Sequence, residues 1–216
     1  MKKLILVVVL SLGAIFSGLA QKVITKSLNV QDKKAEMKFD FADTIQIEAW
    51  NKNTIELEVT VNIDENKYND YYALNVEDFG NSFDLTEKVD FEGIKKAEGK
   101  KNLCNFESEI NYKLKVPADL EFSLKTISGK ILLVGAKGKL TLNSVSGFID
   151  YSIPSATKAR INLSTVTGEV YSNVKFDNPT AEKMSWVGTK RDLSLNGGGT
   201  PVELKTVSGD IFLRKL

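Results

Sequence analysis

The 216-residue chain contains no histidine and a single cysteine, Cys104. The missing histidine excludes the usual Ser-His-Asp and Cys-His catalytic arrangements, and with them the commonest metal ligand and acid–base group. A lone cysteine cannot form an internal disulfide, so a packed core must hold the fold, and we expect Cys104 to be a small buried side chain. We therefore expect no catalytic residue, no zinc or other metal site and no cofactor.

The chain also lacks an excess of either charge, and it lacks a long apolar run beyond residue 20. Residues 1–20, MKKLILVVVLSLGAIFSGLA, place Lys2 and Lys3 before an apolar segment that ends in small residues. This pattern predicts a cleaved secretory signal peptide and no membrane span in the mature chain. Without those two lysines the 29 basic residues become 27 against 28 acidic, and the net charge moves from +1 to −1. This balance argues against a nucleic-acid partner and against general attraction to an anionic membrane.

A fourfold repeat is the dominant feature that the chain does contain. The copies read LEFSLKTISGKILL, GKLTLNSVSGFIDY, ARINLSTVTGEVYS and TPVELKTVSGDIFL, and they align on Gly129, Gly147, Gly168 and Gly209. Self-similarity with a period near 20 residues is typical of stacked β-coils. The last two glycines are 41 residues apart, about twice the other spacings of 18 and 21. We therefore expect a degenerate coil over residues 184–198, with a loop insertion at residues 176–183.

Each copy carries apolar residues seven, five and two positions before its glycine and two positions after it. Alternation with polar residues predicts strands with one face inward, and we expect all four of these positions to be buried. The step from five to two before the glycine breaks the period, which predicts a corner. A hydroxyl residue precedes each glycine, which predicts a turn that uses the freedom of glycine at positive φ.

The first half of the chain also reads as strands. Alternation over residues 45–49 and 55–63 around the turn WNKNT (50–54) predicts a β-hairpin. Residues 110–116 alternate up to Pro117, which predicts a strand end, and the polar segments 64–72 and 91–102 are expected to be loops. We expect an N-terminal strand region (21–116) and a repeat region (117–216) that form one continuous domain.

Three runs resemble a known bacterial family: IQIEAWNKNTIELEVTV (45–61), YKLKVPADLEFSLKTISGKI (112–131) and LNGGGTPVELKTVSGDIFLRK (195–215). They are similar to the exported adhesin-like proteins with β-strand repeats (DUF4097-like), which are frequent in Bacteroidetes. The resemblance covers roughly residues 40–216. It implies an all-β, right-handed, β-helix-like roll, and crossover chirality favours the same hand. It provides no active-site residues.

Two sets of outward positions are candidates for a contact face. The first is a polar ladder four residues before each glycine: Lys125, Asn143, Ser164 and Lys205. The second is an aromatic strip after the glycines, formed by Tyr151, Tyr171 and Phe212, which would suit sugar or protein contact if exposed. Plain solvation of the ladder and core packing of the aromatics are the alternatives.

Other polar clusters are weaker candidates for chemistry. Asp150, Glu169 and Asp210 lie near the coil corners, where a carbohydrate-active enzyme would need a carboxylate pair. The loop with Asp64, Glu65, Asn66, Asn69 and Asp70 lacks the spacing and glycine of a calcium loop. Gly197–Gly199 precede a strand without the lysine of a phosphate-binding loop, which favours a turn.

These observations favour a non-enzymatic exported contact protein of the periplasm or cell surface, whose partner is a cell-envelope protein or a polysaccharide. The alternative is an assembly or structural protein, including a homo-oligomer, that pairs through an open strand edge at residues 211–216. A carbohydrate-active enzyme of the β-helix type is the least favoured hypothesis.

Overall fold

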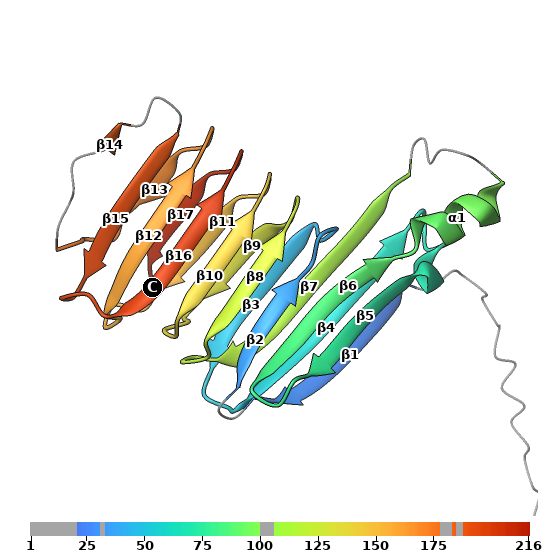
Figure 1. Cartoon of the computed structure of the whole chain (residues 1–216), viewed down its shortest axis with the longest axis horizontal. Coiled ribbons are helices and arrows are strands. Elements are labelled where there is room, and N and C mark those ends of the chain that lie inside the picture. Colours follow the sequence, from blue (N-terminus) through green and yellow to red (C-terminus); the bar gives the residue numbers. More distant parts are fainter. Residues whose placement is uncertain (1–20, 31–32, 100–105, 178–182, 185–187) are drawn as a thin grey trace, which may run out of the picture.

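The computed structural model describes residues 21–30, 33–99, 106–177, 183–184 and 188–216. Its strands form two sheets that pack face to face along a long axis (Figure 1). The eight-stranded sheet contains, in spatial order, β1 (Lys22–Asn29), β4 (Thr54–Ile63), β7 (Ser108–Pro117), β3 (Thr44–Trp50), β9 (Lys130–Val134), β11 (Ile149–Ile153), β17 (Ile211–Lys215) and β13 (Val170–Ser172). The nine-stranded sheet contains β14 (Lys183–Met184), β15 (Thr189–Leu195), β12 (Ala159–Thr165), β16 (Thr200–Thr206), β10 (Leu140–Ser144), β8 (Phe122–Thr126), β2 (Lys34–Lys38), β6 (Ser82–Val89) and β5 (Tyr72–Asp78).

Each repeat forms one coil, with its first strand in the nine-stranded sheet and its second in the eight-stranded sheet. Equivalent strands of neighbouring coils pair in parallel and in register, as in Leu142 beside Leu124 and Leu204. The all-β prediction is confirmed in the form of two sheets of mixed strand direction. A further coil, β2–β3, stacks on β8–β9. The repeat alignment missed this coil because the alignment was anchored on glycine. Asp43 stands directly before β3, whereas β9 follows Gly129 and the other second strands begin two residues after their glycine.

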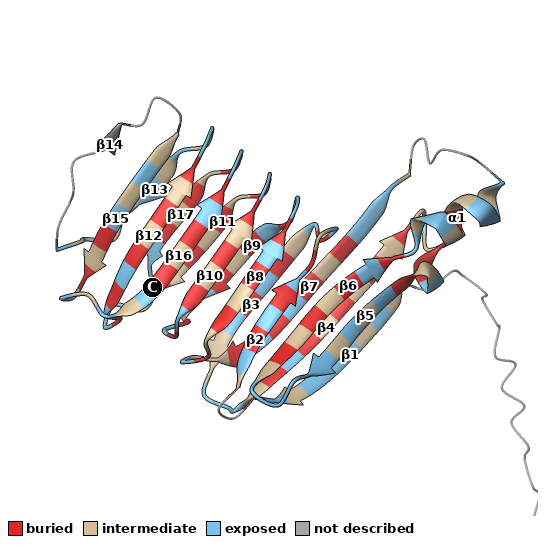
Figure 2. Cartoon of the chain, in the orientation of Figure 1, coloured by how far each residue is buried: buried red, intermediate tan, exposed pale blue. Residues whose placement is uncertain are grey.

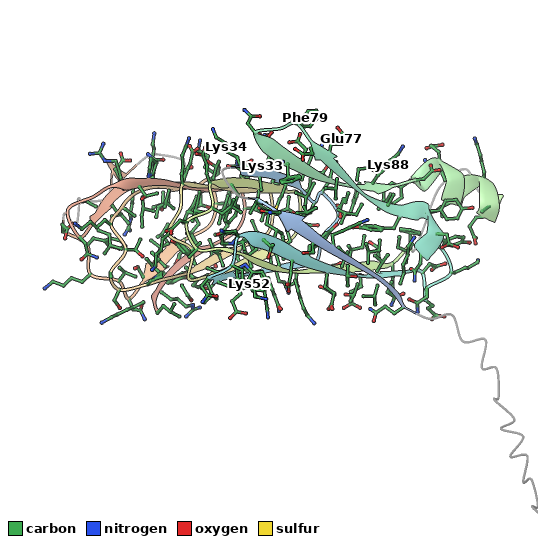
Figure 3. The ribbon with its side chains drawn as sticks, turned by 90° about the horizontal axis from the view of Figure 1, so that it is seen from below. Lys33, Lys34, Lys52, Glu77, Phe79 and Lys88 are labelled. Carbon is green, nitrogen blue, oxygen red and sulfur yellow. The ribbon has the colours of Figure 1, made fainter. Side chains whose placement is uncertain are left out.

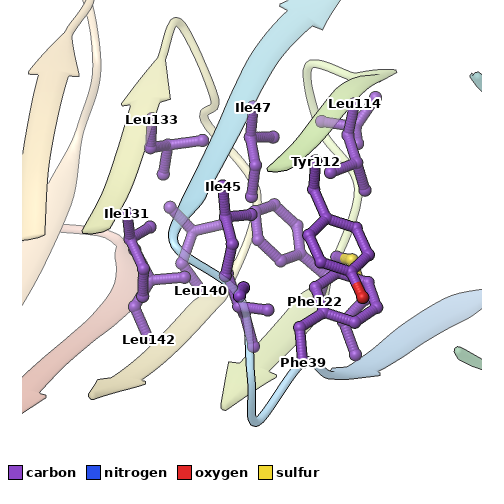
Figure 4. Packing of buried hydrophobic residues seen from close by; sticks show 14 of the residues in the cluster. Phe39, Ile45, Ile47, Tyr112, Leu114, Phe122, Ile131, Leu133, Leu140 and Leu142 are labelled. Carbon is purple, nitrogen blue, oxygen red and sulfur yellow. The ribbon is translucent and has the colours of Figure 1, made fainter. Parts of the chain in front are cut away.

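The core lies between the sheets and follows the predicted alternation (Figure 2). The apolar residues seven and five positions before each glycine are all at most 2% exposed. Figure 4 shows Ile45, Ile131 and Leu140 from both sheets meeting in this interior. Burying each such side chain contributes about 1.5–3 kcal/mol. Because the coils stack on one another, these side chains form one continuous apolar core.

The prediction of buried residues two positions before each glycine is wrong. Ile127, Val145, Val166 and Val207 are 41–48% exposed and form a ridge along the corners. The hydroxyl residue one position earlier points inward instead and is buried in every copy: Thr126, Ser144, Thr165 and Thr206. Each of these oxygens accepts the N–H of its own glycine, as Ser144 Oγ does from Gly147 at 2.8 Å. This bond satisfies the polar atom that the corner buries.

The repeat glycines serve a different purpose from the predicted one. None of them has a positive φ. A Cβ on Gly147 would overlap the carbonyl oxygen of Gly129, and one on Gly209 would overlap that of Gly147. Glycine is therefore required at Gly147, Gly168 and Gly209, because the backbones of stacked coils approach closely at this corner.

The predicted hairpin between β3 and β4 does not form. β7 lies between them, parallel to β3 and antiparallel to β4. The turn at Asn51–Asn53 is present, but the longer alternating strand β7 pairs with both neighbours. β7 ends at Pro117, as predicted.

The C-terminal coil occupies an unexpected place. β16 lies between β10 and β12, and β17 lies between β11 and β13 (Figure 1). The open edge expected at residues 211–216 is therefore wrong for residues 211–213, which are paired on both sides, while Arg214 and Lys215 pair with β11 alone. The degenerate coil is wrong as well, because β15 returns antiparallel beside β12 rather than stacking as a coil. Residues 178–182 and 185–187 of the expected loop and coil lie outside the described residues.

Residues 91–102 were expected to form a loop, but α1 (Phe91–Glu98) is helical. Asp90 caps the helix by accepting the N–H of Gly93 at 2.9 Å, and Gly99 ends it with a φ of 65°. The segment 64–72 contains turns and a short 3-10 helix, η1 (Asn69–Tyr71). Within the described ranges no helix has the length and apolarity needed to cross a membrane. The predicted signal peptide and Cys104 lie outside these ranges.

Candidate functional site

The outer face of the eight-stranded sheet carries side chains in rows that cross every strand. One row is continuous from one edge of the sheet to the other: Thr25, Glu58, Lys113, Gln46, Leu132, Asp150, Phe212 and Tyr171. Neighbours in such a row are about 5 Å apart, because strands are spaced by about 4.8 Å. The row is polar and charged at the β1 end and aromatic at the β13 end, with Leu132 and Asp150 between these two parts.

A groove lies over the charged and apolar part of this face. It has a volume of about 890 Å³ and is lined by residues of β1, β4, β7, β3 and β9, most of them outward. The lining combines carboxylates, ammonium groups, hydroxyls and the apolar Leu132 and Val134. A volume of this size is within the range of small-molecule pockets.

Charges in the groove are ordered by strand. β4 presents Glu56 and Glu58, and the adjacent β7 presents Lys113 and Lys115. Lys113 Nζ lies 3.5 Å from Glu58 Oε1, and both side chains are open to solvent. Such exposed pairs contribute about 0–1 kcal/mol to stability, so these charges are available for a ligand.

Three aromatic side chains form what we call the aromatic patch: Phe148, Tyr171 and Phe212. The rings of Tyr171 and Phe212 are stacked, with centroids 5.2 Å apart and planes 12° apart. Phe148 meets Phe212 edge-on at 5.9 Å. Tyr171 is 47% exposed at the short edge strand β13. Two residues of the predicted aromatic strip therefore lie together, and Phe148 joins them.

Tyr151, the third residue of that strip, lies elsewhere. It is fully buried, and its hydroxyl donates a 2.7 Å hydrogen bond to the carbonyl oxygen of Ala136. Burial raises its pKa well above the usual range of tyrosine. It pairs with Leu213, one position out of phase with Phe212. Tyr151 is therefore a core residue rather than part of a contact face.

The predicted polar ladder lies on the outer face of the other sheet. Ser164, Lys205, Asn143 and Lys125 are cross-strand neighbours in that order. The two lysines are exposed and the other two residues are partly exposed. Lys205 forms an ion pair with Glu203 of its own strand. The ladder exists as a geometric feature, and its role in contact stays a prediction.

The three carboxylates at the coil corners already have hydrogen-bond partners. Asp150 accepts two bonds from Arg214 Nε, at 2.9 and 2.8 Å. Glu169 accepts from the Tyr171 hydroxyl at 2.6 Å, which raises the pKa of that tyrosine. Asp210 accepts from the backbone N–H of Glu169 at 2.8 Å.

The two remaining polar clusters are turns. Asp64, Glu65 and Asn66 all have positive φ, and Asn69 is buried as an acceptor for the N–H of Ile63. Gly197–Gly199 also have positive φ and form a turn, as predicted. Among the described residues, no group of three or more His, Cys, Asp or Glu side chains is placed to hold a metal ion.

Sequence reasoning missed a buried polar network in the first half of the chain. The hydroxyls of Tyr72 and Tyr112 lie 2.8 Å apart, and Tyr112 donates to Glu87 Oε2. Phe41 N–H donates to the other oxygen of Glu87, and Phe39 stacks on Tyr112 at 4.0 Å. Burial raises the pKa of Glu87 to about 7 and the pKa of both tyrosines. The sequence contained one signal of this network. Glu87 continues the alternation of Phe83 and Leu85, which places its side chain on the inward face of β6.

A contrasting surface lies at the tip of the β5–β6 hairpin. Phe79 is 58% exposed there, beside the ion pair of Lys33 and Asp78. Figure 3 shows Phe79, Lys33 and Lys88 projecting from one side of the two layers and Lys52 from the other. Phe79 is therefore an exposed aromatic residue far from the aromatic patch in the sheet order, which makes it a useful control.

Comparison with known proteins finds a solved structure that shares the overall fold. A putative cell adhesion protein from Clostridium sporogenes superposes with a TM-score of 0.56 at 12% identity, over 91% of this chain and all of that chain. A putative adhesin from Parabacteroides merdae gives a TM-score of 0.29 at 15% identity, over 70% of this chain and 62% of that one. No curated protein matches the sequence significantly. The family described as "Toastrack DUF4097" matches residues 93–214, so the chain belongs to the toastrack DUF4097 family.

Proposed function

We propose that this protein is an exported, non-enzymatic contact module of the cell envelope, which binds an extended polymer along the outer face of the eight-stranded sheet. The observation that carries this proposal is the unbroken row of outward side chains from Thr25 to Tyr171, with a groove at one end and the aromatic patch at the other. Solenoids present extended surfaces of this kind to long partners.

The absence of catalysis is part of the proposal. Its support is that Asp150, Glu169 and Asp210 are held by Arg214, Tyr171 and a backbone N–H respectively. A glycosidase needs one carboxylic acid that protonates the leaving oxygen and one carboxylate that acts as base or nucleophile, and each of these three groups is already engaged by a neighbour.

Export and the hand of the coil belong to the proposal as well. Export rests on the charged, apolar and small-residue pattern of residues 1–20. The similarity to a Clostridium sporogenes protein described as a "putative cell adhesion protein" supports an extracytoplasmic role. We propose a right-handed winding, since parallel crossovers strongly prefer that hand.

Cosedimentation with isolated native cell envelopes tests the proposal. The purified mature chain should sediment with envelopes, and Lys113→Ser with Lys115→Ser should weaken this at least fivefold. The matched control is Lys125→Ser with Lys205→Ser on the opposite sheet, which should bind like the parent. Equal binding of both double variants, or digestion by protease only after the cytoplasm is released, would contradict the proposal.

A further inference from the structure

The aromatic patch departs from the pattern of the surface around it. Outward positions of β4, β7 and β3 carry charged or polar side chains, such as Glu58, Lys113 and Gln46. At the corner directly before β11, and at outward positions of β17 and β13, the residues are aromatic instead: Phe148, Phe212 and Tyr171. None of the three rings belongs to the hydrophobic core cluster, and Tyr171 is 47% exposed, so its ring is open to a partner.

Hydrogen-bonding groups surround the patch in fixed positions. Arg214 lies with its guanidinium carbon 5.2 Å from the Phe212 ring and is paired with Asp150 through two bonds. Glu169 is oriented by the Tyr171 hydroxyl, and Asp210 by the backbone of Glu169. The patch therefore combines apolar ring surface with preordered donors and acceptors, which is the usual composition of a site for a polar ligand with apolar faces.

The size of the patch argues against a folded protein as its partner. Three strands at about 4.8 Å spacing, with the rings at two levels about 6.6 Å apart along the strands, give a patch of roughly 10 by 7 Å between backbone positions. A stable protein interface needs about 800 Å² on each partner, several times this area.

We propose that the aromatic patch is a sugar-binding platform, on which a pyranose ring of a polysaccharide packs against Tyr171. The C–H groups on one face of a pyranose carry partial positive charge, which suits the negative face of an aromatic ring. The sugar hydroxyls find acceptors in Asp210 and Glu169 and a donor in Arg214. This inference rests on the proposed function, since it names the ligand class of the same face.

Affinity electrophoresis in gels that contain mannan, xylan, xyloglucan or chitosan tests the platform directly. At least one polysaccharide should retard the chain, and Tyr171→Ala should weaken its Kd at least tenfold. Tyr171→Phe, which keeps the ring, should stay within about threefold of the parent. Phe79→Ala removes an exposed aromatic side chain elsewhere and should change nothing. Equal loss in Tyr171→Ala and Phe79→Ala, or retardation by none of the four polysaccharides, would overturn the inference.

Treated envelopes separate this inference from the proposed function. Periodate, which cleaves vicinal diols, should abolish binding of the parent chain, whereas proteinase K should leave it intact. Binding that survives periodate but is lost after proteinase K would overturn the sugar platform and leave an envelope protein as the partner. Absence of binding to untreated envelopes would instead contradict the proposed function itself.

Discussion

The two halves of the molecule share the same two sheets but are stabilised differently. Around β8 to β17, small side chains at the corners let backbones approach, and a buried hydroxyl repeats in every copy. Around β2 to β7, large side chains fill the interior, with Phe39 stacked on Tyr112 and Tyr112 bonded to Glu87. The first half has no repeated glycine because Asp43 stands at its corner and accepts the N–H of Ile110 at 2.8 Å.

The two halves therefore specify their strand register and packing in two different ways. In the repeat half, each contact recurs in several coils, so register follows from periodicity. In the first half, one buried network holds one arrangement, because its polar groups are satisfied only together. Substitutions in the repeat half should therefore act through steric overlap or cavities. Substitutions in the buried network of the first half should act through its hydrogen bonds and the pKa of Glu87.

The largest effect is expected from Gly147→Ala. The added Cβ would overlap the carbonyl oxygen of Gly129 in the neighbouring coil, and neither backbone can yield without breaking the stack. We expect a loss of about 5 kcal/mol or failure to fold. Gly129→Ala is the matched control, since its Cβ would meet Thr126 Oγ1 at 2.8 Å and the Ala42 oxygen at 3.1 Å. Urea denaturation should show a clearly smaller loss there, and equal losses would contradict the close-approach explanation.

Leu142→Ala should follow in size. Leu142 is fully buried between the parallel neighbours Leu124 and Leu204, so truncation leaves a cavity in the shared core. The expected loss in free energy of unfolding is about 2–5 kcal/mol. A loss below about 0.5 kcal/mol in the same urea experiment would mean that Leu142 does not face the core.

Glu87 should make the stability of the first half depend on pH. Its pKa is raised from 4.5 to about 7 by burial, so the folded chain holds a proton that the unfolded chain has released. This contribution is complete below about pH 4.5 and is lost as pH rises through 7, with a total of about 3 kcal/mol. Glu87→Gln should remove this decline in stability between pH 5 and pH 8. A parent chain whose unfolding free energy is constant over that range, or rises, would contradict the assignment.

The smallest effect is expected at the corner ridge. Val145 is 48% exposed, so Val145→Ser should change the unfolding free energy by less than about 0.5 kcal/mol. Serine is already tolerated beside it at Ser146. A loss above about 1.5 kcal/mol in urea would show that the ridge is buried in solution, for example against a second copy of the chain.

Sequence alternation predicted the inward phase of the repeat strands well, because it is a local property of the pleated strand. It could not predict that β7 would insert between β3 and β4, or β17 between β11 and β13. Those neighbours are chosen among many similar strands that lie far apart in the sequence. The aromatic patch was predicted in part, since Tyr171 and Phe212 share a phase. Tyr151 was misplaced because it lies one residue further along its strand.

Lysine labelling most directly tests which sheet makes contact. Lys113 and Lys205 have similar side-chain exposure, 65% and 50%, on the outer faces of the two sheets. The mature chain would be acetylated with and without native envelopes, and the modification of each lysine read by mass spectrometry. Contact along the eight-stranded sheet predicts that envelopes protect Lys113 and Lys115 and leave Lys125 and Lys205 reactive. Protection of Lys125 and Lys205, with Lys113 and Lys115 still reactive, would contradict it and assign contact to the polar ladder.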